Sequence, residues 1–137
     1  MLARPEPRHG RFVAVSSSVV LKATPQLGEC SAPKGGVFGL ARGLAADIAN
    51  TGITSNVVQP GATRTSILDP SAAAYDLPPI EDFAAHHIDN RLLEPEEVAA
   101  AIIWLCPRAA AIARLCSRAA AAVNGVVLPV DVGMTAR

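Results

Sequence analysis

The chain has few aromatic residues, no excess of charge and no long apolar run. Aromatic side chains make up 4% of its 137 residues, and the formal net charge is zero. A chain without net charge offers no electrostatic basis for binding nucleic acid or an anionic membrane surface. The longest apolar stretch, Val98 to Cys106, ends at Pro107 and is much shorter than the roughly 18–20 residues that cross a bilayer. We therefore expect neither nucleic acid nor a membrane as a partner.

Signals for export, disulfides and metal binding are also lacking. The start of the chain, residues 1–8, has no apolar core of a signal peptide. Adjacent His86 and His87 have no third ligand nearby, and successive helical residues point about 100° apart. This pattern predicts a surface loop and no metal site. The chain has three cysteines without Cys-x-x-Cys spacing: Cys30, Cys106 and Cys116. This odd number and this spacing favour a reduced, cytoplasmic setting over a disulfide framework or a zinc site.

A phosphate-binding glycine turn is missing as well. The sequence contains neither Gly-x-x-x-Gly-x-Gly nor Gly-x-Gly-x-x-Gly, the turns that bring a helix N-terminus to a dinucleotide pyrophosphate. Without such a turn there is also no acidic residue at the expected distance for a ribose hydroxyl. The chain alone is therefore expected to bind a dinucleotide weakly or not at all.

What is present is an alternation of strand and helix patterns. Strands are predicted over residues 12–16, 53–58 and 126–130. Helices are predicted from Cys30 to about Asn50 and from Pro95, the latter with an apolar face of Val98, Ile102, Ile103 and Leu105. Strands that alternate with helices form parallel sheets with right-handed crossovers. We expect an α/β fold of about three parallel strands, part of a Rossmann-like sheet.

Three segments fall outside this alternation. Residues 1–10 are polar and proline-broken, which predicts a lead-in loop. Residues 62–94 lack strong periodicity, which is typical of a functional lid or a disordered insertion. Residues 105–111 recur almost unchanged at 115–121, which indicates a tandem duplication.

A set of polar residues follows the predicted strands in a specific order. Ser17 follows the first strand, Cys30 and Lys34 lie one turn apart on the next helix, and Pro60-Gly61 closes the second strand. In order and spacing, these residues and the terminal segment 128–131 resemble the second half of the short-chain dehydrogenase/reductase family. That family carries a serine, then Tyr-x-x-x-Lys, then a Pro-Gly loop. The resemblance implies that residues 1–137 are the C-terminal portion of such a domain, with 62–94 as its substrate lid.

The resemblance implies a role for each of these residues. Ser17 would bind the substrate carbonyl or hydroxyl, residue 30 would exchange the proton that accompanies hydride transfer, and Lys34 would lower the pKa of the proton donor and hold the nicotinamide ribose. Cys30 occupies the position of the family's tyrosine, and its sulfur stops several ångströms short of a tyrosine hydroxyl. Proton transfer requires hydrogen-bond distance, so we expect hydride transfer to be impaired. An alternative is a thiol site in which Lys34 activates Cys30.

The resemblance also implies a nicotinamide loop. Pro60, Gly61, Thr63 and Thr65 match the residues that contact the carboxamide and the pyrophosphate, and Asn56 would fix the strand end before them. The cofactor is NAD or NADP; the substrate stays open. Asn90 and Val132 stand where glycine is usual in the family. If residue 132 needs a positive φ, a β-branched side chain there is strained.

The predicted surfaces for association are a helix stripe and a sheet edge. Gly35, Gly39 and Gly43 recur every four residues within helix 30–50, and in the family this helix pairs across a dimer interface. Close packing of the stripe on the chain's own sheet is the alternative. The first strand would leave an open edge that invites pairing. A truncated remnant of the enzyme is the first interpretation; a non-catalytic interaction module, or an enzyme completed by a separate chain, are the others.

Overall fold

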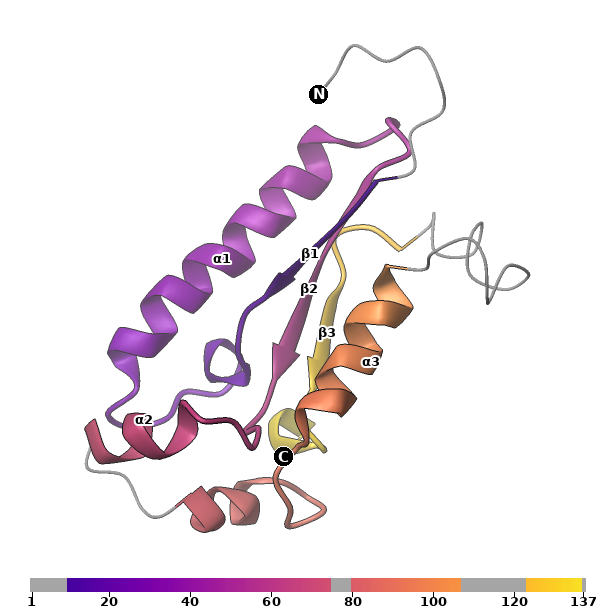
Figure 1. The fold of residues 1–137 in the computed structure, drawn as a ribbon. Helices are drawn as coiled ribbons and strands as arrows, with labels where there is room; N and C mark the ends of the chain where they lie inside the picture. The colour runs from indigo at the N-terminus through magenta and orange to yellow at the C-terminus, as the bar shows by residue number, and fades with distance from the viewer. Residues whose placement is uncertain (1–9, 75–79, 107–122, 137) are drawn as a thin grey trace.

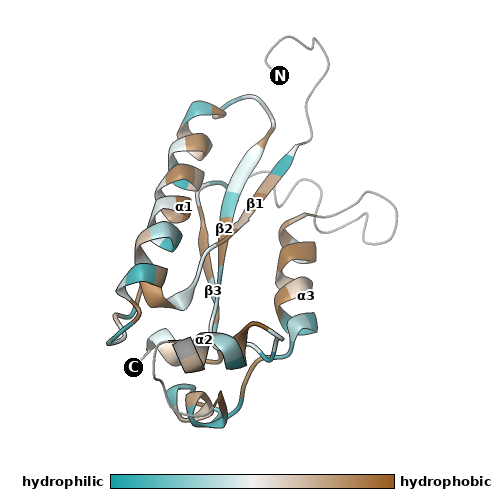
Figure 2. Cartoon of the chain, turned by 60° about the vertical axis from the view of Figure 1, so that its left-hand side comes forward, coloured by the Kyte–Doolittle hydropathy of each residue, from teal (hydrophilic) through white to brown (hydrophobic). Residues whose placement is uncertain are grey.

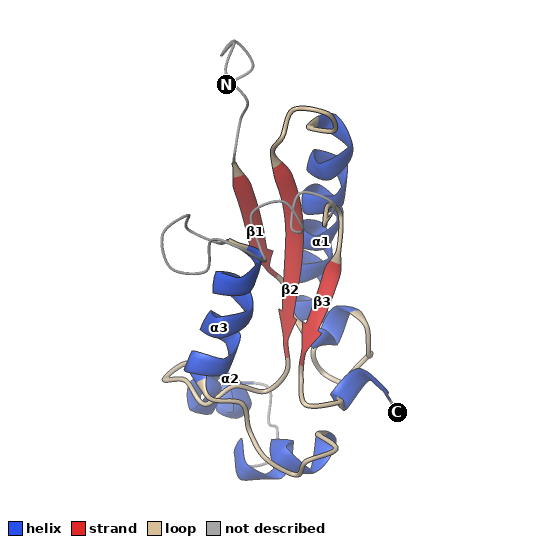
Figure 3. Ribbon diagram, turned by 90° about the vertical axis from the view of Figure 1, so that its right-hand side faces the viewer, coloured by secondary structure: helices blue, strands red, loops and turns tan. Residues whose placement is uncertain are grey.

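The computed structural model describes residues 10–74, 80–106 and 123–136. A central sheet lies between two helices, with α1 (Gly28–Asp47) on one face and α3 (Pro95–Leu105) on the other, as Figures 1 and 3 show. This layering buries both faces of a parallel sheet, as such sheets require. It confirms the α/β expectation and both helices.

The sheet has three strands, all parallel, in the order β1-β2-β3: β1 (Arg11–Val15), β2 (Thr54–Pro60) and β3 (Val127–Val130). The register pairs Val13 with Asn56 and Val58 with Leu128. Each strand begins or ends within two residues of its predicted bounds. The partial Rossmann-like sheet is therefore confirmed for the described part of the chain.

The middle strand is buried along its length although half of it is polar. The Ser55 hydroxyl donates to the Ala41 carbonyl oxygen of α1 at 2.7 Å. The Asn56 side chain donates to the Val123 carbonyl at 3.0 Å and accepts from the Val126 amide at 3.1 Å. These bonds satisfy buried polar groups. They also correct one expectation: Asn56 ties β2 to the chain entering β3, and does not fix the strand end before Pro60.

Small residues let α1 lie close to the sheet. Ala41 and Ala45 are its buried residues, and Val37 packs against the same core, so the buried face recurs every four residues. Leu40, an apolar residue of the same helix, is 67% exposed. A Cβ added at any glycine of the stripe would meet nothing within 4 Å: Gly35, Gly39 and Gly43. The stripe therefore faces away from the sheet, and its packing on the chain's own sheet is ruled out among the described residues.

Helix α3 starts at Pro95 and buries Leu105 in its last turn. Val98, Ile102 and Leu105 follow helical spacing, but Ile103 is rotated by about 100° from Ile102. Ile103 is 62% exposed and Trp104 is 55% exposed, so assigning Ile103 to the buried face was wrong. Figure 2 shows most of this helix in brown, the colour of hydrophobic residues. No helix in the described part of the chain is long and apolar enough to span a membrane.

Short helices occupy the segment between β2 and α3. They are α2 (Leu68–Ala74) and η2 (Ile80–His86), and they lie below the carboxyl ends of the strands in Figure 1. The predicted lid region is thus partly helical. Two further single turns lie near the strand ends, η1 (Ser18–Val20) and η4 (Met134–Ala136). The duplicated sequence 105–111 and 115–121 lies mostly outside the described residues.

The turn after β3 has an unusual backbone. Val132 has φ +43° and Gly133 has φ +79°, the region that L-residues with a branched Cβ rarely adopt. The Asp131 carboxylate stabilises the turn, accepting from the Gly133 amide at 3.1 Å and from the Thr135 hydroxyl at 2.6 Å. Asn90 likewise has φ +49°. Residue 132 thus has the positive φ at which a β-branched side chain is strained.

Candidate active site

A cleft of about 600 Å³ opens at the carboxyl ends of the strands. In parallel α/β sheets this edge is where ligands bind. The cleft brings together residues that are far apart in the sequence, including every candidate catalytic and cofactor residue: Ser17, Cys30, Lys34, Pro60, Gly61, Thr63 and Thr65. All seven candidate residues therefore line the same cleft, and the role of each stays a prediction.

One side of the cleft carries the candidate catalytic residues. Ser17 follows β1 and caps η1, since its Oγ accepts from the Val19 amide at 3.4 Å. The Lys34 Nζ donates to the Val15 carbonyl oxygen at 3.3 Å. The Ser16 hydroxyl donates to the Lys34 carbonyl oxygen at 2.9 Å, which joins the end of β1 to α1. The Cys30 thiol is partly buried and free of any disulfide.

The opposite side is formed by the segment after β2, residues 60–65. The Gly61 amide continues the sheet by donating to the Val130 carbonyl at 3.0 Å. A parallel bridge pairs Thr63 with Leu93, whose amide donates to the Ala62 carbonyl at 3.0 Å and whose carbonyl accepts from the Arg64 amide at 2.8 Å. The segment is thus extended and bonded on one side, with Thr63 and Thr65 lining the cleft.

Gly61 needs the absence of a side chain. A Cβ at this position would lie 2.7 Å from His87 Nε2, 3.0 Å from Asp131 Cβ and 3.1 Å from Asp131 Cα. Real Cβ atoms do not approach other atoms this closely, and one of the neighbours is backbone. The glycine therefore lets the segment lie directly on the imidazole and on the turn after β3.

The cleft lining fits a phosphate-bearing aromatic ring such as a nicotinamide nucleotide. Two ammonium groups, of Lys22 and Lys34, line it, and no carboxylate is among the lining residues that the structure describes. Anionic groups are therefore attracted and not repelled. Much of the remaining wall is apolar, with Leu27, Ile67, Leu68, Phe83 and Met134. No cluster of three or more potential metal ligands occurs among the described residues.

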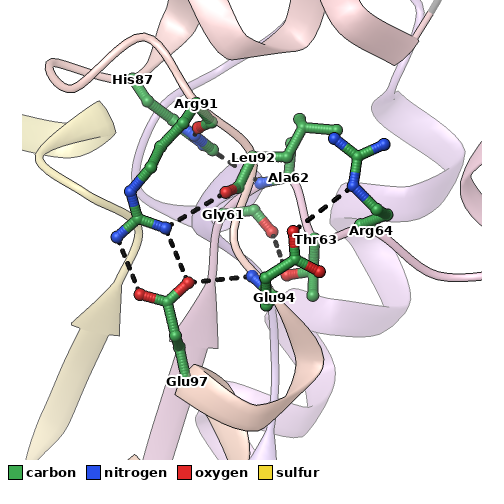
Figure 4. Close-up of polar contacts among 9 residues, drawn as sticks. All are labelled: Gly61, Ala62, Thr63, Arg64, His87, Arg91, Leu92, Glu94 and Glu97. Atoms are coloured by element: carbon green, nitrogen blue, oxygen red, sulfur yellow. Dashed lines mark hydrogen bonds and ion pairs between the residues drawn. The ribbon is translucent and has the colours of Figure 1, made fainter.

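His87 contacts the segment 60–65 from behind the cleft, and this contact was missed by sequence reasoning. His87 was placed in a surface loop, but its exposed fraction is 0%. Its Nε2 accepts from the Ala62 amide at 3.2 Å, and its Nδ1 bonds the Arg91 carbonyl oxygen (Figure 4). Of the two adjacent histidines, His86 is the exposed one, and it lines the cleft. No signal of burial surrounds His87 in the sequence, because the contact partners lie 25 and four residues away.

An exposed ion pair stabilises the entry to α3. The Arg91 guanidinium donates to both carboxylate oxygens of Glu97, each at 2.7 Å, and the Glu94 amide donates to Glu97 Oε2 at 2.9 Å (Figure 4). Hydrogen bonding from Arg91, and then from the Glu94 backbone, lowers the pKa of Glu97 from 4.5 to about 2. Arg64 makes a longer pair with Glu94 at 3.4 Å. Both pairs fasten the chain that runs beside residues 60–65.

Comparison with known proteins gives consistent results along the chain. Residues 2–135 match the family model described as enoyl-(acyl carrier protein) reductase. An A-factor type gamma-butyrolactone 1'-reductase of Streptomyces virginiae is 34% identical over 92% of the chain and 45% of its own length. An inactive 2-(S)-hydroxypropyl-CoM dehydrogenase 2 of Xanthobacter autotrophicus is 33% identical over 96% of the chain and 54% of its own length.

Solved structures agree with the sequence matches. A putative 2-deoxy-D-gluconate 3-dehydrogenase from Agrobacterium tumefaciens with bound NADP is 28% identical, with a TM-score of 0.72 over 96% of this chain and 48% of that one. The chain thus spans about half the length of the relatives that it matches. On the fold, the assembled cleft and these matches, the chain belongs to the short-chain dehydrogenase/reductase family.

Proposed function

We propose that this chain forms the substrate-facing and nicotinamide-facing part of an NAD(P)-dependent oxidoreductase site, and that Cys30 impairs its hydride transfer. The observation that carries the proposal is the single cleft that collects Ser17, Cys30 and Lys34 on one side and residues 60–65 on the other. Relatives named as reductases and dehydrogenases, and a related structure with bound NADP, support the reaction class.

When bound, the nicotinamide supplies the hydride acceptor or donor. The Ser17 hydroxyl would orient the oxygen of a carbonyl or alcohol substrate by a hydrogen bond, since it lies at the cleft wall next to the end of β1. The Lys34 ammonium would hold ribose hydroxyls and favour a negative charge on a neighbouring proton donor. Thr63 and Thr65 would contact the carboxamide and the pyrophosphate from the opposite wall.

Cys30 is the weak position of this arrangement. A general acid or base must come within about 2.6–3.2 Å of the atom whose proton it moves. A cysteine side chain ends after one carbon, whereas a tyrosine places its hydroxyl beyond a full ring. Residue 30 therefore supplies no proton donor at the reach the reaction needs. One relative is itself named as an inactive dehydrogenase, so a family member without turnover has a precedent.

Restoring the tyrosine tests the assignment. We expect Cys30→Tyr, in a fusion of this chain to the first half of a complete family member, to raise nicotinamide-dependent turnover by about 100-fold or more, the usual contribution of a general acid–base group. Cys30→Phe is the matched control, with the ring but no hydroxyl, and should give no rise. Equal rates for Tyr and Phe would contradict the proposed site.

Cofactor binding by the chain alone is tested by calorimetric titration with NADH and NADPH. Micromolar binding would show that the chain completes a site without the glycine-rich turn, through self-association or another segment. If a folded chain shows no heat of binding at millimolar cofactor, the chain alone does not bind the cofactor, and the remaining candidates are a remnant of the enzyme or a module that binds a partner. A cytoplasmic setting, in keeping with free thiols at Cys30 and Cys106, belongs to the same proposal.

A non-catalytic interaction module is the second candidate, and the outer face of α1 favours it. Leu40 is 67% exposed there, and the Gly35, Gly39 and Gly43 stripe leaves room for another helix to approach. We propose this face, or the free edge of β1, as the self-association surface. Light scattering should then show a dimer that Gly39→Gln dissociates. A monomer at all concentrations would exclude the module.

A further inference from the structure

The imidazole of His87 connects two segments that are distant in the sequence. It is completely buried; Nε2 accepts from the Ala62 amide at 3.2 Å, while Nδ1 meets the carbonyl oxygen of Arg91. A carbonyl oxygen only accepts, so Nδ1 carries the hydrogen and the ring is the neutral tautomer. One ring thus bonds a partly buried amide of the candidate nicotinamide segment and a carbonyl of the chain before α3.

The bond to Ala62 holds the segment against the chain before α3. The Ala62 amide donates to His87, the Ala62 carbonyl accepts from the Leu93 amide, and the Arg64 amide donates to the Leu93 carbonyl. Neither His87 nor Leu93 is among the described residues that line the cleft, whereas Ala62, Thr63 and Thr65 are. Successive side chains of an extended segment point to opposite sides, so Thr63 and Thr65 share one side. A change in the backbone at Ala62 would therefore alter how both threonines are presented.

Contact as well as hydrogen bonding keeps the segment in place. His87 Nε2 lies 2.7 Å from where a Gly61 Cβ would be, so the ring fills the space beneath the glycine. The ring is itself anchored, because the Ile88 amide donates to the Val132 carbonyl oxygen at 3.0 Å. Figure 4 shows His87 beside Ala62 and Gly61, behind the Arg91–Glu97 pair.

We infer that His87 is a positioning residue, which presents Thr63 and Thr65 to the cofactor by holding the Ala62 amide. The inference rests on the proposed function, and extends it to a side chain that does not line the cleft. Loss of the acceptor at Nε2 leaves the partly buried Ala62 amide without this partner, which favours a change in the backbone of the segment.

Three substitutions separate the hydrogen bond from packing. Gln at residue 87 can place an oxygen near the Nε2 position, Asn is too short to reach Ala62, and Phe keeps the ring shape without an acceptor. The primary readout is amide hydrogen exchange by NMR at Ala62, relative to Val57, whose amide donates to the Val126 carbonyl oxygen at 2.9 Å. We expect His87→Asn and His87→Phe to raise this ratio by about tenfold, and His87→Gln to keep it within about threefold. His86→Asn, the same change at the exposed neighbour, should leave it unchanged.

The second readout is binding of NADH, followed by its fluorescence. Affinity should fall about tenfold in His87→Asn and recover in His87→Gln. If the unaltered chain binds no NADH, the cofactor part of the proposed function fails, and the exchange ratio alone decides the role of His87. An exchange ratio that is the same in Gln, Asn and Phe variants would overturn the inference, even where all three are less stable. So would equal NADH affinity in Gln and Asn variants of a chain that binds it.

Discussion

The two sides of the cleft are built differently. Residues 60–65 are held by backbone bonds to β3 and Leu93, by the buried His87 and by a glycine that tolerates no side chain. On the other side, the side chains of Ser17 and Lys34 make long hydrogen bonds, of 3.4 and 3.3 Å, and Cys30 is partly exposed. Residues 60–65 are therefore part of the fold, whereas the candidate catalytic residues present single side chains from it.

This difference bears on the proposed loss of hydride transfer at residue 30. A substitution at the partly exposed Cys30 removes few buried contacts, so the cleft is expected to keep its shape. A substitution at Gly61 or His87 disturbs closely packed groups of the fold. The shape of the cleft and the proposed turnover can therefore be tested separately. The following predictions test this contrast.

Gly61→Ala should have the largest effect on stability. Its Cβ would overlap His87 Nε2 and the Asp131 backbone, and overpacking of this kind costs about 2–3 kcal/mol of unfolding free energy. Gly39→Ala is the matched control, because nothing lies within 4 Å of its Cβ, and it should add up to about 1 kcal/mol. Urea unfolding measures both. Equal stability of the two variants would show that the loop is not tightly held.

Val132→Gly should stabilise the chain. Its φ of +43° is strained for a β-branched residue, and relief of that strain outweighs the backbone entropy of glycine by about 1 kcal/mol. The same change at Val130, in extended β3, should destabilise. Thermal unfolding distinguishes them, and a lower midpoint for Val132→Gly would refute the strain.

Glu97→Gln should make a smaller, pH-dependent difference. The pKa of Glu97 is lowered from 4.5 to about 2 in the folded chain, so its ionisation stabilises the fold above pH 4.5, and this contribution is lost as the pH falls towards 2. The gap in urea midpoint between the unaltered chain and the variant should therefore narrow across that window. A gap that stays constant with pH would argue against the Arg91 pair.

Cys30→Ala should have the smallest effect on stability. The thiol is partly exposed at the cleft wall, and such substitutions usually change stability by no more than about 0.5 kcal/mol. Chemical denaturation provides the measurement. A loss of about 2 kcal/mol or more would mean that Cys30 is packed as a core residue, and the contrast between the two sides of the cleft would be reduced.

Much of the fold was readable because local patterns and topology agree. Apolar runs that end at serines or at Pro-Gly predicted the first two strands, the apolar run 126–130 predicted the third, and Pro95 predicted the start of α3. Ser17, Cys30 and Lys34 could be placed together because their order and spacing resemble the family's serine and Tyr-x-x-x-Lys pattern, and the structure brings them to one cleft. The positive φ of Val132 followed from a departure from a family glycine.

The remaining features depend on tertiary contacts that local sequence does not encode. Burial of His87 arises from Ala62 and Gly61, whose position depends on the sheet. Asn56 finds its partners at residues 123 and 126, across the sheet. The buried side of α3 was misjudged at Ile103, because four apolar residues in a short helix leave its inner face ambiguous.

The single tryptophan of the chain gives a built-in optical probe. Trp104 is 55% exposed in the last turn of α3, and in Figure 1 this end of the helix lies farther from the carboxyl ends of the strands than its start does. Its fluorescence should shift to shorter wavelength when another surface covers α3, and should keep its wavelength when a small ligand enters the cleft. One emission spectrum per titration point therefore distinguishes docking of a protein on this helix from occupancy of the candidate site.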